Sequence, residues 1–279
     1  MPQFILSMLI FGTVGLFVRG IDLPSSTIAL ARGLMGAAFL VCAALALRKS
    51  LCVGLSRSTL TRLFVSGVFL GLNWIFLFEA YRHTTIAAAT LSYYTAPAIM
   101  TLLSPFVLKE KLSTKKLVCL AVCFVGMGCV VGTEPGSLAD GGLIGIGFGL
   151  IAASFYAAVV LNNKFLGPIE PTTSSVIQLG SAAAAILPYV LATTDFASMS
   201  VGMDQLGLLI VVGIVHTGVA YFLYFSALPK LSTQRVSIFS YIDPAFAVVL
   251  SILVLAEPFT AMTLIGAFLI LGAALASEL

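Results

Sequence analysis

Charged side chains are scarce in this chain. Lys and Arg together number 14 and Asp and Glu 11, so that 9% of the 279 residues are charged, where an ordinary soluble domain has about 25%. So few charges cannot cover the surface of a soluble protein of this length. The formal net charge is only +3 and no long basic stretch occurs, which excludes nucleic-acid binding as the main role.

Motifs that bring catalytic or metal-binding groups together are also missing. The chain has two histidines, and it lacks a phosphate-binding glycine loop, a nucleophile elbow and the usual zinc spacings. Cys119 and Cys123 share one helix face, but no third ligand lies at metal-binding spacing, which favours packing. We therefore expect no cofactor, no metal and no enzymatic activity, with an intramembrane enzyme as a remote alternative.

Apolar residues, by contrast, make up 60% of the chain, and the mean hydropathy is +1.13. A helix that crosses a bilayer needs about 17–25 mostly apolar residues. Ten such stretches occur, at 3–19, 28–47, 60–81, 86–108, 116–132, 142–163, 173–193, 205–228, 236–256 and 260–277. Several are apolar throughout, without the alternation of a β-barrel strand. The sequence therefore predicts an all-α integral membrane protein with ten transmembrane helices.

Lysine and arginine residues gather in alternate loops between these stretches. If the N-terminus lies inside, the inner loops hold eleven of them and the outer loops hold only Arg19 and Arg82. Because positive residues mark the cytoplasmic side of a membrane protein, we predict a multi-pass protein of the inner or plasma membrane. Both termini are then cytoplasmic.

The chain also contains an internal repeat at an offset of 147 residues, which aligns 71–117 with 218–264 without gaps. A Tyr-x-x-Pro frame with a glutamate 13 residues after the proline occurs in both copies, as Tyr94, Pro97, Glu110 and as Tyr241, Pro244, Glu257. The repeat divides the chain into 1–132 and 133–279, with five predicted helices each. Because five is odd, the halves enter the membrane from opposite sides, as in secondary transporters with a midplane site between inverted repeats.

Several segments resemble the EamA-type family of the drug/metabolite transporter superfamily. They are Tyr94–Pro97 with Leu108–Leu112, Tyr241–Pro244 with Leu255–Phe259, and Gly71–Arg82. Arg32 matches an arginine often found in the family's second helix, whereas Phe11-Gly12 stands where the family usually has Trp-Gly. The resemblance covers nearly the whole chain, and it implies export or exchange of amino acids and other small metabolites. The shared motifs specify the fold far more than the substrate.

Apart from tyrosine and cysteine, the ionisable side chains that lie deepest within predicted spans are Arg32, Glu79, His216 and Asp243. Charges there are costly, so each is a functional candidate. Asp243 is the strongest, because a deep carboxylate needs a cation, a proton or a donor. His216 is interpreted as a polar cavity group, or alternatively as a packing residue. Glu79 could instead form an ion pair with Arg82 or Arg32.

Aromatic and amide side chains share this depth, and they complete the predicted site. The predicted substrate-binding residues are Asn73, Trp74, Glu79, Tyr93, Tyr94, His216, Tyr221, Tyr241 and Asp243, and the predicted structural or gating residues are Arg32, Pro97 and Pro244. Ring faces next to a carboxylate could hold an ammonium group, so an organic-cation carrier is the alternative to an amino-acid transporter. Without an ATP-binding motif, a proton, an ion or exchange must drive transport. We expect a monomer or a weak homodimer in the lipid bilayer.

Overall fold

The computed structural model describes residues 1–48, 51, 54–109, 114–131, 142–167, 169–196, 199, 201–231, 239–240, 242–255 and 260–278. The elements in these residues are helices, and no strand occurs among them. The first half contains α1 (Pro2–Arg19), α2 (Ser25–Ala46), α3 (Arg57–His83), α4 (Ile86–Tyr93), α5 (Ala96–Val107) and α6 (Thr114–Val131). The second half contains α7 (Gly142–Asn163), α8 (Pro171–Thr193), α9 (Met203–Gly213), η1 (Ile214–Val219), α10 (Ala220–Ala227), η2 (Leu228–Lys230), α12 (Ile242–Leu255) and α13 (Ala261–Glu278).

Each predicted apolar stretch is mostly helical in its described residues, and two stretches contain a break that the sequence did not predict. The stretch 86–108 is divided into α4 and α5 at Tyr94 and Thr95. Pro97 therefore lies in the first turn of α5, where its missing N–H leaves no hydrogen bond unmade. Pro244 likewise lies in the first turn of α12. Pro97 thus lies at the start of a helix rather than in the middle of one.

The second break is the π-helical segment η1, which joins α9 to α10 within the stretch 205–228. Such insertions widen one helical turn and often occur at functional sites. Here η1 carries His216 and Thr217, both buried. The Thr217 hydroxyl donates to the Val212 carbonyl at 2.8 Å, five residues earlier in the chain. This side-chain bond follows the wider turn of the π-helix.

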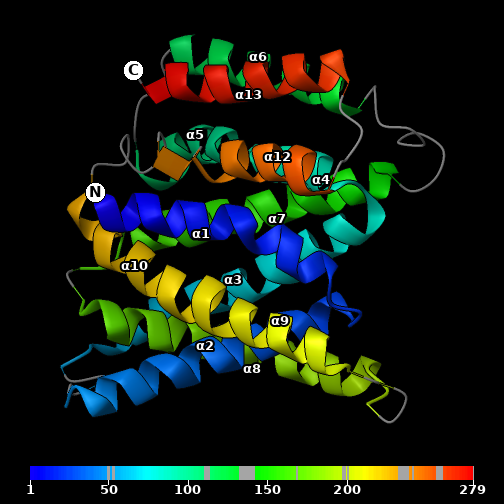
Figure 1. Ribbon diagram of the computed structural model, residues 1–279. Coiled ribbons are helices and arrows are strands. Elements are labelled where there is room, and N and C mark those ends of the chain that lie inside the picture. The colour runs from blue at the N-terminus through cyan, green and yellow to red at the C-terminus, as the bar shows by residue number, and fades with distance from the viewer. Residues whose placement is uncertain are drawn as a thin grey trace.

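The helices lie roughly side by side in layers (Figure 1). One outer layer is the pair α6 and α13, and α4, α5 and α12 form the next. The layers with α1 and α7, and then α3 and α10, follow, and α2, α8 and α9 cover the opposite side. Helix α1 begins and α13 ends at the same end of the bundle (Figure 1). Helices α1, α3, α7 and α12 therefore belong to the middle layers of the bundle.

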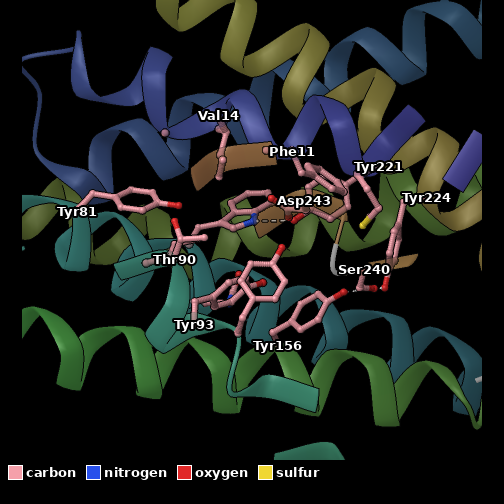
Figure 2. Close-up of a pocket in the computed structure, with 18 of the residues that line it drawn as sticks. Phe11, Val14, Tyr81, Thr90, Tyr93, Tyr156, Tyr221, Tyr224, Ser240 and Asp243 are labelled. Carbon is pink, nitrogen blue, oxygen red and sulfur yellow. Dashed lines mark hydrogen bonds between the residues drawn. The ribbon is translucent and has the colours of Figure 1, made fainter. Parts of the chain in front are cut away.

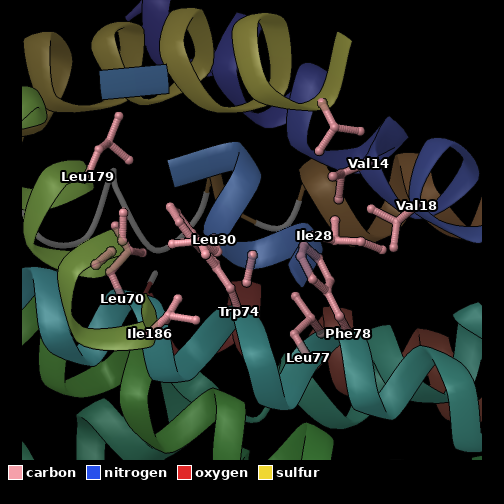
Figure 3. Packing of buried hydrophobic residues seen from close by; sticks show 14 of the residues in the cluster. Val14, Val18, Ile28, Leu30, Leu70, Trp74, Leu77, Phe78, Leu179 and Ile186 are labelled. Atoms are coloured by element: carbon pink, nitrogen blue, oxygen red, sulfur yellow. The ribbon is translucent and has the colours of Figure 1, made fainter. Parts of the chain in front are cut away.

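The main apolar core joins α1, α2, α3, α8 and α9, and it includes Trp74 and Leu179 (Figure 3). Large apolar side chains are also largely exposed on the outside, such as Phe106, Leu253 and Phe268. Six helices among the described residues are long and apolar enough to cross a bilayer, namely α1, α2, α3, α7, α8 and the continuous helix α9–η1–α10. An exterior this apolar is suited to lipid.

Candidate functional site

A polar pocket lies in the middle layers of the bundle (Figure 2). It is a cavity of about 70 Å³ between α1, α2, α3, α4, α7, α10 and α12. The polar and aromatic side chains that line it are Phe11, Arg32, Asn73, Trp74, Tyr81, Thr90, Tyr93, Tyr94, Tyr156, Tyr221, Tyr224, Ser240 and Asp243. Six of these are tyrosines, so hydroxyl groups and ring faces form most of its wall.

Asp243 supplies the only carboxyl group among the residues that line this pocket. It lies in the first turn of α12, and its carboxyl group hydrogen-bonds with the side chain of Tyr94, which follows α4. Helix α1 approaches closely at Gly12, where a Cβ atom would lie 2.8 Å from the Asp243 carbonyl oxygen. The glycine therefore allows α1 to cover the start of α12 and to form one wall beside the carboxyl group.

Arg32 brings the opposite charge to the same pocket from α2. Its guanidinium group lies over the Trp74 ring, 4.4 Å from the ring centroid, in a cation–π arrangement. Its Nε donates to the Thr217 hydroxyl at 2.8 Å and its Nη2 to the His216 carbonyl at 3.5 Å. The side chain is only 3% exposed. Thus η1 and an aromatic ring hold this buried cation in a defined orientation.

Trp74 and Tyr221 connect the two halves of the chain within the pocket. The Trp74 Nε1–H donates to the Tyr221 hydroxyl at 2.9 Å, and their rings are 5.7 Å apart. The two residues are 147 positions apart, which is the offset of the sequence repeat. Corresponding positions of the two repeats therefore touch at the centre of the molecule.

Further aromatic side chains surround this contact. Tyr93 packs against Tyr156 with ring centroids 5.6 Å apart, and the Tyr156 and Tyr224 hydroxyls hydrogen-bond at 3.2 Å. Figure 2 shows these rings around the space that Asp243 faces. Asn73 fixes α3 to α7 through a bond from its Nδ2 to the Ala152 carbonyl at 2.7 Å. The wall is thus held by bonds between helices.

Six of the nine predicted substrate-binding residues line this one pocket, and Arg32 joins them. The six are Asn73, Trp74, Tyr93, Tyr94, Tyr221 and Asp243. Their role in binding a substrate stays a prediction. Tyr241 lies outside the described residues, as do Glu110 and Glu257.

Glu79 and His216 lie elsewhere. Glu79 lies near the C-terminal end of α3, 3.9 Å from Arg82 and 3.7 Å from His83. The contact with Arg82 is the ion pair of the alternative interpretation. The His216 Nε2 hydrogen-bonds with the Thr13 hydroxyl at 2.7 Å, and its ring packs on Phe17. Neither residue is among those that line the pocket.

The predicted list omitted Tyr81, Tyr156, Tyr224 and Ser240, which line the pocket. The available signal was depth, because Tyr156 and Tyr224 lie well inside predicted apolar stretches, whereas tyrosine usually prefers the membrane interface.

As for metals, no group of three His, Cys, Asp or Glu side chains is close enough to hold an ion in the part of the chain that the structure describes. The described pocket instead offers one carboxyl group, one guanidinium group and many ring faces.

Known proteins resemble this chain in sequence along nearly its full length. The EamA-like transporter family matches residues 2–132 and 143–277. The uncharacterized transporter YxxF of Bacillus subtilis is 32% identical over 250 residues, which cover 89% of this chain and 79% of that protein. An uncharacterized transporter of Archaeoglobus fulgidus is 29% identical over 97% of this chain and 93% of its own length.

The fold also matches a solved crystal structure. That structure superposes on this one with a TM-score of 0.72, over 99% of this chain and 95% of the other, at 19% sequence identity. At this identity the likeness concerns the fold. The family match over both halves, together with the Bacillus relative, shows that the chain belongs to the EamA-like transporter family.

Proposed function

We propose that this protein is a secondary transporter that carries small zwitterionic metabolites, with amino acids as the leading class, by alternating access. The family and the names of its relatives make it a multi-pass membrane transporter of the drug/metabolite type. The observation that carries the proposed substrate class is that Arg32 and Asp243 both line one aromatic pocket. A proton gradient, an ion gradient or exchange supplies the energy, and the working unit is a monomer or a weak homodimer.

Ten membrane spans in two inverted halves, 1–132 and 133–279, are part of this proposal. The first and last residues of α13 lie 147 positions after the first and last residues of α6, which is the offset of the sequence repeat. The packing supports the same correspondence between the halves. The contact of α1 with α12 has its counterpart in the contact of α7 with α5. The contact of α3 with α8 likewise has its counterpart in the contacts of α2 with α9 and η1. Such a pattern is expected when a two-fold axis relates two repeats. The contact between Trp74 and Tyr221 then lies on that axis.

The orientation in the membrane rests on the distribution of positive charge. Eleven lysine and arginine residues lie in the loops at the end where α1 begins, if the proposed spans are correct. Because Figure 1 places the start of α1 and the end of α13 at one end of the bundle, both termini would face the cytoplasm. We therefore propose the inner or plasma membrane as its location.

The pocket supports a zwitterionic substrate through charge. A guanidinium group binds a carboxylate well, and a carboxylate among ring faces can hold an ammonium group. The cavity of about 70 Å³ is smaller than the roughly 300–1,000 Å³ of ordinary ligand pockets. It holds a few water molecules at most in this conformation. A substrate would therefore enter when the two halves move apart, as alternating access requires.

An organic cation is the second candidate, because the bonding of Arg32 favours it. The Nε and Nη2 atoms of Arg32 already donate to Thr217 and to the His216 carbonyl. These bonds use two of the five N–H donors of the guanidinium group and hold it against η1, whereas Asp243 and the rings offer the groups that attract a cation. A carboxylate within an aromatic wall then suits a quaternary amine.

Binding can be followed with the intrinsic fluorescence of Trp74, because it is the only tryptophan of the chain and lines the pocket. Purified protein is titrated with a panel of amino acids and with tetraethylammonium, and uptake and exchange are then measured in proteoliposomes. Saturable signals from amino acids alone would favour the zwitterion, and signals from tetraethylammonium alone would favour the cation. If proteoliposomes show neither uptake nor exchange with a broad metabolite panel, the transport proposal fails.

Asp243→Asn is the decisive variant, with Asp204→Asn as its control, because Asp204 is exposed in the first turn of α9. We expect Asp243→Asn to abolish saturable binding and Asp204→Asn to leave it unchanged. A monodisperse size-exclusion profile must show that the Asp243 variant is folded. Equal binding by the two folded variants would refute the role of Asp243.

A further inference from the structure

A second cavity lies near the central pocket, between the end of α7, the start of α8 and the end of α10. Its volume is about 340 Å³, which is within the range of small-ligand sites, roughly 300–1,000 Å³. One wall carries the polar side chains of Asn163, Lys164 and Ser174, and apolar residues such as Val160 and Phe225 form another. The cavity is therefore amphipathic and larger than the central pocket.

Two helices lead from the central pocket to this cavity. On α7, Tyr156 lines the pocket, whereas Val160 and Asn163 line the cavity. On the other side, Tyr221 lines the pocket, and Phe225 and Leu228 line the cavity. Residues spaced by four and then three positions share a helix face, so both helices present one continuous face to the two spaces. One helical turn, about 6 Å, separates the linings of the two spaces along α7.

The hydroxyl pair of Tyr156 and Tyr224 stands at this junction. The two oxygen atoms are 3.2 Å apart, and both side chains line the pocket, as Figure 2 shows. Phe225, the next residue, lines the cavity and is only 4% exposed. The pair thus connects α7 to α10 beside the residues of both helices that line the cavity.

The position of the cavity in the bundle indicates which side it serves. The first turns of α1 pack against the end of α10, since Phe4 and Met8 cluster with Tyr224 and Ala227. The cavity therefore lies at the end of the bundle where α1 begins (Figure 1). That is the end for which the distribution of positive charge predicts a cytoplasmic location.

The polar wall of the cavity is firmly supported. The Asn163 Nδ2 donates to the Ser66 hydroxyl at 3.0 Å and to the Gln178 Oε1 at 3.2 Å. The Gln178 Nε2 donates to the Ser174 hydroxyl at 2.9 Å, which leaves the Ser174 proton able to donate to a ligand. Ser66 and Gln178 are fully buried. Such a network fixes Asn163 and Ser174 in place on the wall, as a site for a polar head group requires.

We propose that this cavity is the cytoplasmic vestibule of the transporter, a second site for the transported metabolite, and that the Tyr156–Tyr224 pair closes the passage to the central pocket. The polar head of the molecule lies against Asn163 and Ser174, and its apolar part lies against Val160 and Phe225. This inference rests on the proposed transport function, since a vestibule needs a central site to serve.

Cysteine accessibility tests the vestibule without knowledge of the substrate. The five native cysteines are first replaced by serine. Leu228→Cys then reports on the cavity, and Ala247→Cys reports on the central pocket, which Ala247 lines. Inside-out vesicles expose the cytoplasmic face to 2-sulfonatoethyl methanethiosulfonate, which does not cross membranes. We expect rapid labelling of Leu228→Cys and slow labelling of Ala247→Cys.

The closing pair is tested by the labelling rate of Ala247→Cys from the same side. Tyr224→Phe should raise this rate roughly two- to tenfold, the factor expected from the loss of one neutral hydrogen bond. Tyr156→Phe should raise it at least as much, because the Tyr156 hydroxyl also bonds to Ser240. The double variant should raise it no further than Tyr156→Phe alone, because that change already removes the bond that Tyr224→Phe removes. Tyr189→Phe is the control, since Tyr189 is exposed on α8, and it should have no effect.

Two outcomes would overturn the inference. If Leu228→Cys reacts only from the opposite side of the membrane, or from neither side, the cavity is not a cytoplasmic vestibule. If the tyrosine variants leave the rate for Ala247→Cys unchanged, or if their effects add, the pair does not close the passage. A protein that shows the expected labelling but no transport of any metabolite would refute the proposed function and leave the passage in place.

Discussion

Thr217 bonds the buried Arg32 to the π-helical segment, and its replacement by valine tests how much this arrangement contributes to stability. The Thr217 hydroxyl accepts from Arg32 Nε and donates to the Val212 carbonyl, both at 2.8 Å. Valine has nearly the same shape but cannot form either bond. We expect Thr217→Val to lower the free energy of unfolding and to release Arg32 from its place over Trp74.

The size of the effect follows from the two bonds. A hydrogen bond to a charged group contributes about 1.5–3 kcal/mol, and a neutral one contributes about 0.5–1.5 kcal/mol. Thr217 is fully buried and Arg32 is 3% exposed, so water does not replace the lost partner. The expected loss is therefore about 2–4 kcal/mol. If the π-helical turn changed to an ordinary α-helical turn in the variant, the loss in free energy of unfolding would be near the lower value.

The assay is an SDS titration in detergent micelles that is monitored by the fluorescence of Trp74, the only tryptophan. Thr217→Ser is the matched control, because it keeps the hydroxyl and removes only the methyl group that packs near Gly36. It should cost about 1 kcal/mol or less. A valine variant within about 0.5 kcal/mol of the parent, or a serine variant that loses as much as valine, would refute this account.

Further predictions concern helix packing and surface charge. Gly67→Ala should destabilise the protein by about 1–3 kcal/mol, because its Cβ would lie 2.5 Å from the Gln178 carbonyl oxygen. Gly180→Ala has no atom within 4 Å and should be neutral or stabilising, and thermal denaturation in detergent compares the two; equal melting temperatures would contradict the close contact. Glu79→Gln should change the free energy of unfolding by less than about 1 kcal/mol, because its ion pair with Arg82 at 3.9 Å is exposed; a loss above about 2 kcal/mol in the SDS titration would show that Glu79 has a further role.

The helical stretches could be predicted because a membrane helix has a one-dimensional signal. Hydropathy alone placed α7 at its observed bounds, 142–163, since every residue of a long apolar run must satisfy its backbone within the helix. The breaks were not predicted. The division at Tyr94 and Thr95 and the π-helical turn at Thr217 depend on side-chain bonds and helix contacts that hydropathy does not contain.

Depth along each helix predicted most of the pocket residues that were named. It did not predict the side of the helix on which each side chain lies. Asn73 and Glu79 were both named from the predicted stretch 60–81, yet Asn73 lines the pocket and Glu79 pairs with Arg82. His216 has the right depth, but its ring turns toward Thr13 and Phe17. Which face of a helix meets the pocket is set by the neighbouring helices.

The sequence by itself determined that the chain is an apolar helical membrane protein with an internal repeat, because scarcity of charge and a repeated Tyr-x-x-Pro frame are visible without any packing. Only the tertiary structure decided that Arg32 and Asp243 share one aromatic pocket and that Trp74 bonds to Tyr221 at the equivalent position of the other half. The physical reason is that these residues belong to helices far apart in the chain. Their meeting depends on close crossings such as that of α1 and α12 at Gly12.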